Sequence, residues 1–312
     1  MKPTRDGFGE GLIELGRTNK DVVAMCADLT ESTRAGWFKD KFPDRFFSFG
    51  VSEQDMYSAA AGLALVGKIP FASTFGVFAS GRAWDQIRIS IAYMNLGVKI
   101  VGTHGGISVG ADGATHQAIE EIGLLRILPN MTIVVPCDAN EARKATIKCV
   151  DIKGPVYLRL GRNPAPTITK EKDPFEIGKA ATLRDGKDVT IIACGLMVKE
   201  ALLANEELSK KGISARIINL HTPKPIDRKT IVKAARETGA VVTAEEHLTF
   251  CGMGSAVSEV LSEEAPVPMR MIGIRDRFGE SGTPDQLLKR FGLTSSDIVK
   301  AAQEVIGLKK SG

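Results

Sequence analysis

The chain has 312 residues, of which 43% are hydrophobic and 25% are charged, and its formal net charge is +4. This composition is that of an ordinary globular protein of roughly two domains. The basic residues are spread along the chain and form no block interleaved with aromatic residues, so we do not expect a nucleic-acid-binding protein.

Cysteine usage and hydropathy bear on the compartment. The five cysteines are odd in number and scattered, with no C-x-x-C pair, which fits a reducing compartment better than a disulfide framework or a zinc site. The first residues, MKPTRDGFGEG, lack the apolar core of a signal peptide. The longest near-apolar run, residues 59–66, is far shorter than the roughly 20 residues that cross a bilayer. We therefore predict a soluble cytoplasmic protein without membrane association.

The first half of the chain alternates apolar, β-branched runs with helical patterns. Strands are predicted at 22–28, 45–50, 69–75, 98–103, 131–136 and 156–161, and helices at 6–17, 53–66, 77–94, 117–127 and 138–150. In the first helix Phe8, Leu12 and Leu15 have the i, i+4, i+7 spacing of one buried face. Apolar strands joined by helices favour a parallel sheet that is covered on both faces, so the predicted fold class is α/β.

The alternation is interrupted at residues 162–188, where three prolines and many charges indicate a linker leading to an edge hairpin. It then resumes with strands at 189–195, 214–220, 240–246 and 269–274, helices at 197–211, 226–238 and 254–263, and two short terminal helices. We therefore predict two doubly wound α/β domains, a parallel-sheet domain at 1–165 and a smaller domain at 188–312, joined by a linker at 166–187.

The richest polar stretch is GTHGGISVGADGATHQ, residues 102–117. It follows a predicted strand, at the edge where open α/β folds bind ligands, and its glycines allow backbone to approach a ligand closely. Ordinary connectors have only about 2–6 residues, so a solvated loop is the less favoured interpretation. Metal binding by His104, Asp112 and His116 is disfavoured because the histidines lack a helical ligand spacing and no cysteine is near. We predict no metal site in this chain.

Three arginines and a serine lie beside predicted strand ends. Arg5 opens the first helix, Ser32 and Arg34 follow the first strand, and Arg162 follows the sixth. Arginine is the natural fork for a phosphate, and serine adds a hydroxyl donor. Each residue alone would be an ordinary surface residue, but their shared position indicates a site for an anion.

Glu53 begins a helix of small and apolar residues in the stretch GVSEQDM. Ser52 and Asp55 have the spacing of a capping box, and the helix dipole favours a carboxylate in the first turn. From this stretch alone, capping is the preferred interpretation of Glu53.

Two aromatic and two histidine side chains have ordinary structural explanations. Phe75 and Phe78 in STFGVF have the helical spacing that usually means packing in a core. His221 and His247 have no acidic or cysteine partner at a recognisable spacing, and we interpret them as structural residues.

The order of motifs along the chain is more specific than any one motif. Eight follow one another: TR (4–5), ADLTES (27–32), GVSEQDM (50–56), STFGVF (73–78), RAWDQIR (82–88), THGGISVGADGATHQ (103–117), LPNMTIVVPCDANEA (128–142) and RLGRN (159–163). Together they resemble the carboxyl-terminal half of a transketolase, and the resemblance covers essentially the whole chain. It implies a pyrimidine-binding domain followed by a transketolase C-terminal domain.

The resemblance implies thiamine diphosphate as the cofactor. Glu53 matches the glutamate that hydrogen-bonds the aminopyrimidine ring nitrogen and so helps to generate the cofactor's nucleophilic carbon. Phe75 and Phe78 match the aromatic wall around the pyrimidine, and Asp28 matches an acidic residue at the cofactor cleft. The capping role and the catalytic role of this helix start are compatible, because Ser52 can cap while Glu53 points across the cleft.

The resemblance also implies a set of substrate-binding residues in the loops at the strand ends: Arg5, Ser32, His104, Asp112, His116 and Arg162. Arg5, Ser32, His104 and Arg162 match the group that holds the substrate phosphate. Asp112 matches the residue that reads the hydroxyl next to the acceptor aldehyde. The remaining histidine matches a position beside the reacting carbonyl, where some transketolases carry Gln, and is implied in proton transfer.

The chain departs from a full transketolase in what it lacks. The Gly-Asp-Gly motif that holds the diphosphate and Mg²⁺ in this family is absent from the sequence. The resemblance therefore implies one subunit of a split transketolase, whose N-terminal partner subunit holds Mg²⁺, in an assembly that is α2β2. Such an enzyme transfers a two-carbon ketol unit from a ketose phosphate to an aldose phosphate, and this chain alone is expected to be inactive.

Other classes stay open at this stage. A 1-deoxyxylulose 5-phosphate synthase has a similar half, but would show Asp-Arg-Ala-Gly where this chain has Thr-His-Gly-Gly at 103–106. The β subunit of 2-oxo-acid dehydrogenases has the right length and a glutamate like Glu53, but lacks the Gly-Ala-Asp-Gly-x-x-His-Gln pattern. A non-catalytic subunit that serves only assembly is the third alternative, although a scaffold has no physical reason to keep these polar residues.

Overall fold

The first half of the chain alternates helices and strands largely where the apolar runs predict them. Its strands are β1 (Val22–Cys26), β2 (Phe46–Ser48), β3 (Ile69–Phe75), β4 (Lys99–Thr103), β5 (Thr132–Val134) and β6 (Val156–Arg159). Its α-helices are α1 (Thr4–Thr18), α2 (Thr30–Thr33), α3 (Gly36–Lys39), α4 (Glu53–Leu65), α5 (Trp84–Gln86), α6 (Glu121–Arg126) and α7 (Ala139–Lys148). The two short helices α2 and α3 are additions that the sequence did not predict. The computed structural model describes residues 1–310, so the last two residues of the predicted C-terminal domain lie outside it.

One predicted helix is irregular. The segment expected as a single helix at 77–94 is divided into two π-helical turns, η2 (Phe78–Arg82) and η3 (Ile87–Tyr93), with the three residues of α5 between them. Gly81 lies within the first turn, and glycine weakens a regular α-helix. The expectation of one continuous helix is therefore wrong. Such turns are frequent near functional sites.

The six strands form one parallel sheet in the order β2-β1-β3-β4-β6-β5. Every residue of β1, β4 and β6 is buried, because helices cover both faces of the sheet. On one face Phe8 of α1 and Ala142 of α7 belong to a single apolar cluster, and on the other Met56 of α4 packs with Ile87 of η3. Strands β1, β3, β4 and β6 are adjacent and parallel, which places their carboxyl ends along one edge.

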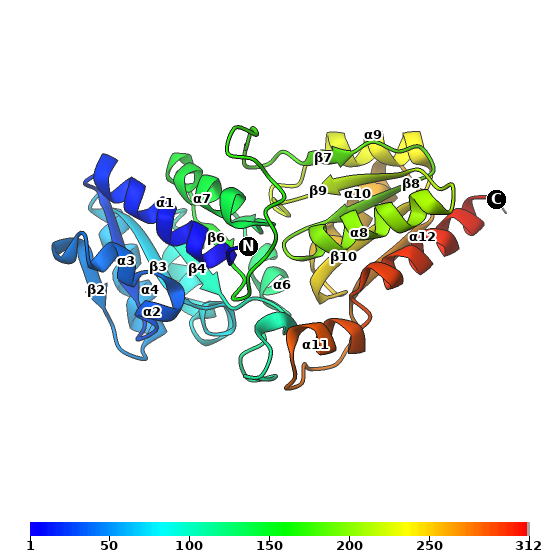
Figure 1. The fold of residues 1–312 in the computed structure, drawn as a ribbon. Coiled ribbons are helices and arrows are strands. Elements are labelled where there is room, and N and C mark those ends of the chain that lie inside the picture. Colours follow the sequence, from blue (N-terminus) through cyan, green and yellow to red (C-terminus); the bar gives the residue numbers. More distant parts are fainter. Residues whose placement is uncertain (311–312) are drawn as a thin grey trace.

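Helices α1 and α7 pack closely together, although they lie far apart in the sequence of this domain (Figure 1). The buried stripe of Phe8, Leu12 and Leu15 faces the sheet, as the sequence predicts. Gly7 allows the close crossing, because a Cβ at this position would lie 2.0 Å from the carbonyl oxygen of Ala139. The crossing holds the first turn of α1, and with it Arg5, over the edge of the sheet.

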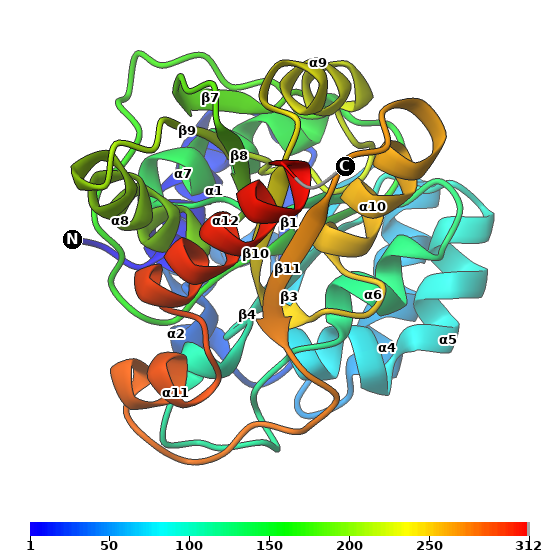
Figure 2. The same cartoon turned by 90° about the vertical axis from the view of Figure 1, so that its right-hand side faces the viewer.

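The second half forms its own α/β sheet. Its strands are β7 (Ala181–Arg184), β8 (Val189–Ala193), β9 (Ala215–Asn219), β10 (Val241–Leu248) and β11 (Met269–Ile274), in the order β11-β10-β8-β9-β7. Its helices are α8 (Met197–Lys210), α9 (Arg228–Thr238), α10 (Met253–Glu264), α11 (Pro284–Arg290) and α12 (Ser295–Lys310). Helices α8 and α12 cover one face of this sheet and α9 and α10 the other (Figure 2). The predicted α/β fold class is confirmed in both halves.

Two details of the second half differ from the sequence-based expectation. Strand β7 lies at the sheet edge but pairs antiparallel with β9, so the predicted hairpin is wrong. Both edges of β8 are already paired, one with β9 and the other with β10, so β7 cannot pair with β8 and adds to the outer edge of β9 instead. Helix α12 is 16 residues long, so it is not a short terminal helix.

The two sheets meet across a buried seam. One apolar cluster runs from Ile133 and Val135 of the first half to Ile192 and Leu220 of the second. Helix α11 packs against η4 (Ile107–Val109), a single turn within the polar loop 103–117 (Figure 1). The second half therefore borders directly on the loop that carries the candidate substrate residues.

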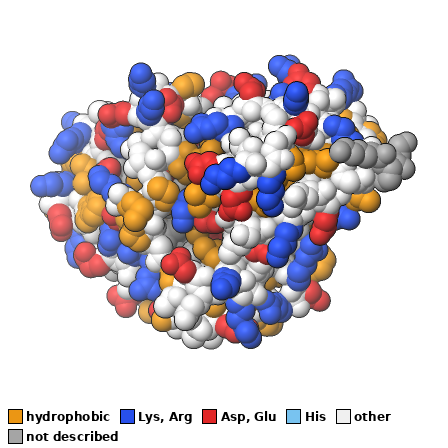
Figure 3. All heavy atoms as spheres, turned by 45° about the vertical axis from the view of Figure 1, so that its right-hand side comes forward, with side chains coloured by type: hydrophobic (Ala, Val, Ile, Leu, Met, Phe, Trp, Pro, Cys, Tyr) orange, Lys and Arg blue, Asp and Glu red, His pale blue; other side chains and the backbone are white. Residues whose placement is uncertain are grey.

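The molecular surface carries charges of both signs. Acidic and basic side chains are interspersed across the face that Figure 3 shows. Within residues 1–310 no helix is both long and apolar enough to span a bilayer.

Candidate active site

Most of the predicted site residues lie at the carboxyl edge of the first sheet. Phe75 is the last residue of β3, and His104 follows β4 directly. Asp28 follows β1, and Arg162 follows β6. Because these strands are parallel and adjacent, their ends bring residues that are far apart in sequence to one edge.

Four rings form the wall of the site. The rings of Phe75 and Phe78 are stacked with centroids 6.0 Å apart, and the imidazole of His104 stacks on Phe75 at 3.8 Å. His116 meets the edges of both phenylalanines, at 6.1 Å from Phe75 and 5.5 Å from Phe78. Phe75 and His104 are buried, whereas Phe78 and His116 are at least partly exposed and border the opening.

Glu53 is the first residue of α4, and its side chain is only 1% exposed. Its Oε1 accepts a hydrogen bond from the hydroxyl of Thr74 at 3.2 Å. The guanidinium of Arg82 donates to both carboxylate oxygens, at 3.2 and 3.0 Å, and lies over the ring of Phe78 at 4.2 Å. The carboxylate thus lies directly behind the aromatic wall, held by one cation.

The predicted capping box at this helix is wrong. Ser52 is the N-cap residue, but within the described chain its side chain caps no helix N–H. Its hydroxyl donates instead to the carbonyl of Phe49 at 2.7 Å. The loop carbonyl before the helix competes for the hydroxyl and binds it.

Three arginines, Arg5, Arg34 and Arg162, lie near His104. Arg5 Nη1 donates to the carbonyl of Ser32 at 2.8 Å, whereas Arg5 Nε is buried and has no hydrogen-bond partner within residues 1–310. Burial lowers the pKa of Arg5, and the neighbouring guanidiniums of Arg34 and Arg162 lower it further, while the Asp6 carboxylate opposes the shift. Arg34 pairs with Asp6 and Arg162 with Asp112, whereas the buried Nε of Arg5 has no partner within residues 1–310, so it is the donor of this cluster that an anionic ligand would satisfy.

The electrostatics of His104 follow from the same cluster. Burial lowers its pKa to about 3, and the positive charges of Arg5 and Arg162 contribute to the shift. Its Nδ1 lies 2.9 Å from the hydroxyl of Thr103. The imidazole is therefore neutral at physiological pH and offers one donor and one acceptor nitrogen.

The loop after His104 carries the remaining polar groups. Asp112 is exposed and forms an ion pair with Arg162 at 3.1 Å, and Arg162 also donates to the carbonyl of Val109 at 3.0 Å. His116 Nδ1 lies 2.9 Å from the hydroxyl of Thr115. Asp28 is exposed after β1 with a left-handed φ of 55°, and no hydrogen bond or ion pair in the described chain joins it to the other site residues.

Sequence reasoning missed two residues of this site, Thr74 and Arg82. Thr74 lies in STFGVF, from which only the two phenylalanines were selected, and Arg82 lies in RAWDQIR, which served only to establish the order of motifs. Arg82 is separated from Glu53 by a complete strand, so no local spacing could have revealed the ion pair. The described residues contain no group of three or more His, Cys, Asp or Glu side chains placed to hold a metal ion.

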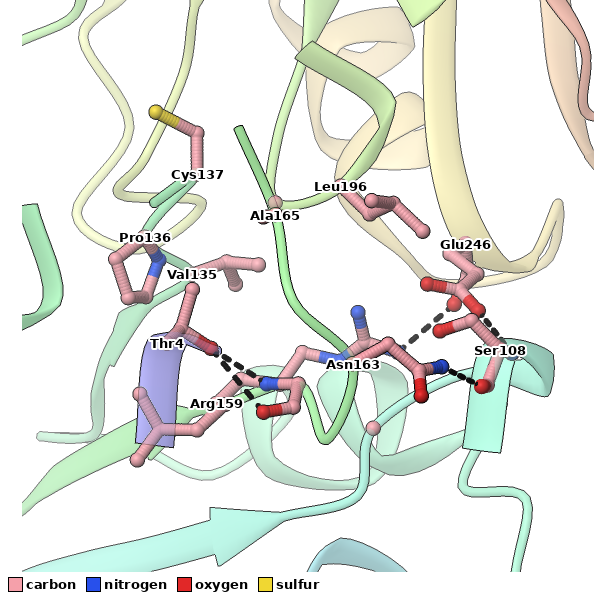
Figure 4. Close-up of a pocket in the computed structure, with 14 residues that line it drawn as sticks. Thr4, Ser108, Val135, Pro136, Cys137, Arg159, Asn163, Ala165, Leu196 and Glu246 are labelled. Carbon is pink, nitrogen blue, oxygen red and sulfur yellow. Dashed lines mark hydrogen bonds between the residues drawn. The ribbon is translucent and has the colours of Figure 1, made fainter. Parts of the chain in front are cut away.

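A small pocket lies at the seam between the two sheets, lined by residues such as Thr4, Arg159 and Glu246 (Figure 4). Arg159 at the end of β6 donates to Glu121 of α6 at 2.5 Å, and to the carbonyl of Glu246 of β10 at 2.8 Å. The cavity volume is about 30 Å³, which suffices for only about two water molecules. This seam is therefore an interdomain contact, whereas the ring wall opens to solvent.

Comparison with known proteins agrees with this geometry. The family "Transketolase, pyrimidine binding domain" matches residues 1–167, and "Transketolase, C-terminal domain" matches residues 178–298. The chain is 46% identical over 96% of its length to the 6-deoxy-6-sulfo-D-fructose transketolase subunit of Clostridium sp., covering 94% of that protein. It is 42% identical over 98% of its length to an apulose-4-phosphate transketolase subunit of Phocaeicola vulgatus, covering 98% of that protein.

A solved structure extends the comparison to three dimensions. It is described as a split gene transketolase in an inactive beta4 tetramer, and it shares 50% sequence identity with this chain. The TM-score is 0.94, over 99% of this chain and 100% of that one.

Proposed function

Because the chain belongs to the transketolase family and carries its pyrimidine-binding and C-terminal domains, we propose that it is the C-terminal subunit of a split transketolase. It transfers a two-carbon ketol unit from a ketose to an aldose, together with a separate N-terminal subunit. The observation that carries the proposal is the pairing of a buried carboxylate, Glu53, with an aromatic wall and a cationic cluster that leaves Arg5 Nε without a partner in the described chain.

The residues at the wall fit thiamine diphosphate. When it is bound, this cofactor supplies a nucleophilic carbon that can attack a ketose carbonyl. Phe75 and Phe78 would hold the aromatic pyrimidine and exclude water from its face. Glu53, whose carboxylate is buried behind the wall, would hydrogen-bond the ring nitrogen. Asp28, which follows β1, would approach the cofactor from the strand end next to that of β3.

The substrate residues divide by chemistry. Arg5, His104, Arg162 and the serine at position 32 bind the terminal anion of the sugar, because arginine forks match the oxygens of such a group. The names of two relatives contain a sulfo-sugar and a sugar phosphate, and both substrates carry an anionic group at one end. We therefore assign this chain a sugar with a terminal phosphate or sulfonate.

Two groups contact the reacting end of the substrate. Asp112 accepts a hydrogen bond from the hydroxyl next to the acceptor aldehyde, after Arg162 exchanges its carboxylate for the substrate anion. His116, at the edge of the ring wall, transfers a proton at the substrate carbonyl oxygen, for which a solvent-accessible histidine is suited.

The partner subunit supplies what the sequence of this chain lacks. We propose that it binds the diphosphate and Mg²⁺, that the complete enzyme is α2β2, and that it acts in the cytoplasm. The description of the similar solved structure as an inactive tetramer supports the requirement for a second chain.

The decisive experiment is reconstitution. The chain is co-expressed with the product of the adjacent reading frame, and ketol transfer from xylulose 5-phosphate to ribose 5-phosphate is measured with thiamine diphosphate and Mg²⁺. We expect turnover by the complex and none by the isolated chain. A parallel arm replaces the donor with a sulfonated ketose to decide which terminal anion is preferred.

Other outcomes select the alternatives. Turnover of pyruvate with glyceraldehyde 3-phosphate by the same complex would favour a 1-deoxyxylulose 5-phosphate synthase. Acyl transfer to a lipoyl group would favour a 2-oxo-acid dehydrogenase. A complex that assembles but turns over no substrate would favour a purely structural role in assembly, and robust turnover by the single chain would refute the requirement for a partner.

A further inference from the structure

The polar loop 103–117 is fastened at its end by one buried side chain, Gln117. This side chain is only 2% exposed. Its Nε2 lies within hydrogen-bond distance of three carbonyl oxygens, at 3.2 Å from Ile107, 3.2 Å from Gly110 and 2.8 Å from Glu280. The first two belong to the loop itself, and the third belongs to the second half of the chain. One amide therefore closes the loop and ties it to the other domain.

The segment 279–282, which lies against Gln117, contains glycines that leave room for this contact. Residues 279–282 belong to the segment 275–283 that connects β11 with α11, and a Cβ on Gly279 would lie 1.6 Å from Gln117 Oε1. Gly110 and Gly113 of the loop have φ values of 91° and 73°, and Cβ atoms on them would approach Gly282 and Ser281 at 3.3 and 2.6 Å. Glycine on both sides lets the two backbones approach closely.

A second tie holds the start of the loop. The backbone N–H of Ser108 donates to the Glu246 carboxylate, which β10 supplies from the second half, and Asn163 donates to the carbonyl of Ser108 (Figure 4). Gly106 leaves room for this carboxylate, because a Cβ there would lie 2.3 Å from its carboxyl carbon. Both ends of the segment between the two ties are thus fixed from the second half.

The three polar residues assigned to the substrate lie around these ties. His104 precedes the first tie, Asp112 lies between the two, and His116 immediately precedes Gln117. Asp112 and His116 remain accessible while the tied residues Ser108 and Gln117 are buried, so the ties orient the loop without occupying its polar groups.

We propose that Gln117 is a positioning residue, through which residues 279–282 of the C-terminal domain set the geometry with which His104, Asp112 and His116 meet the substrate. The loop geometry is a property of the chain alone, and the consequence for the substrate rests on the proposed function. The C-terminal domain thereby acts on substrate affinity without contacting the substrate.

The first test needs neither partner nor cofactor. Gln117→Met keeps the length of the side chain and removes its donor, and Gln303→Met on the exposed face of α12 is the matched control. Hydrogen–deuterium exchange of the isolated chain is followed by mass spectrometry. We expect amides of residues 107–116 to exchange about tenfold faster in Gln117→Met, as for loss of one buried hydrogen bond. Amides of β1 and the control should be unchanged.

A second variant approaches the same contact from the other side. Gly279→Ala places a methyl group against Gln117, whereas Gly307→Ala in α12 places one where nothing lies within 4 Å. Gly279→Ala should accelerate exchange in the same loop peptides and lower the unfolding midpoint relative to Gly307→Ala, because its methyl group must displace Gln117 whereas the methyl group of Gly307→Ala favours the helix. Unchanged loop exchange in both Gln117→Met and Gly279→Ala overturns the inference.

The functional arm uses the reconstituted enzyme. Gln117→Met should raise the KM for the sugar substrates by about tenfold, with kcat less affected, as expected for lost substrate positioning. The Kd for thiamine diphosphate should be unchanged. A fall in kcat and cofactor affinity at constant KM would show a purely structural role and overturn the inference. An inactive reconstituted wild type would instead refute the proposed function, and the exchange result would stand.

Discussion

Two glutamate–arginine pairs in this chain have equally buried carboxylates and very different arginines. At the ring wall Glu53 is 1% exposed and its partner Arg82 is 42% exposed. At the seam Glu121 is completely buried and its partner Arg159 is only 5% exposed. Arg82 therefore lies partly in solvent, whereas Arg159 is enclosed by the seam.

The hydrogen-bond partners of the two arginines reinforce the difference. Arg159 also donates to the carbonyls of Ala118 and Glu246, so it joins the two domains. Burial raises the pKa of Glu121 and of Glu246, while the Arg159 charge opposes both shifts. The comparison teaches that burial of a carboxylate alone does not distinguish a site from a structural contact. The exposure of its counter-ion does.

The largest expected effect tests the ring-wall pair through catalysis. Glu53→Gln keeps the shape of the side chain and should lower kcat of the reconstituted enzyme by about 10³-fold, because under the proposed function it removes the carboxylate that shares a proton with the cofactor. Circular dichroism and complex formation should be unchanged. Glu121→Gln is the matched substitution at the seam and should leave kcat close to that of the wild type. Near-normal turnover by Glu53→Gln would remove the catalytic assignment.

The next effect tests the seam through stability. Arg159→Met leaves two buried carboxylates without their cation and should lower the free energy of unfolding of the isolated chain by about 3 kcal/mol. Arg82→Met removes a half-exposed partner and should cost less than about 1 kcal/mol. Urea unfolding followed by fluorescence measures both. Equal costs would mean that the two pairs do not differ as their exposures indicate.

The smallest effect concerns pH. In the folded chain the pKa of His104 is lowered to about 3, below its ordinary value near 6.5, so the unfolded chain binds the proton first as the pH falls. Stability is therefore complete above pH 6.5 and is lost between 6.5 and 3. Between pH 7 and 5 the wild type should lose about 2 kcal/mol more than His104→Gln, as measured by urea unfolding at each pH.

An anion bound at the arginine cluster should restore part of the stability that the chain loses between pH 7 and 5. Phosphate bound beside Arg5 and Arg162 would favour protonated His104, so the difference between wild type and His104→Gln should narrow in its presence. His247 at the seam, whose pKa is also lowered by burial, should not respond to phosphate. A pH dependence that is identical in both proteins would contradict the environment described for His104.

Much of the architecture was predictable, because each buried strand reads as a continuous apolar run and each helix shows its own period. Ring stacking of His104 on Phe75 agrees with the motif order, since both residues lie at strand ends of one sheet. The missed features are long-range competitions. The hydroxyl of Ser52 binds a loop carbonyl instead of the helix, and β7 bypasses β8 to pair with β9.

Gln117 and Arg82 show the same limit at the site. Gln117 is the last residue of the loop, and no pattern in the residues around it predicts the hydrogen bond from its amide to the carbonyl of Glu280. Arg82 lies in a motif whose local pattern indicates only a helix. The partners of both side chains depend on how separate elements pack, which local sequence patterns do not encode.

The packing of α1 on α7 also has a consequence for biosynthesis. Helix α1 is synthesised well before its partner α7, which begins only at Ala139, so the intervening strands must be made before the two can meet. Until then the stripe of Phe8, Leu12 and Leu15 can pack on the earlier elements of its cluster, such as β1 and α3, but lacks Ala142 and Ala145 of α7. Apolar surface that is exposed during synthesis is prone to association. Arg5 reaches its place above the sheet late, so the anion cluster is completed only near the end of the synthesis of the first domain.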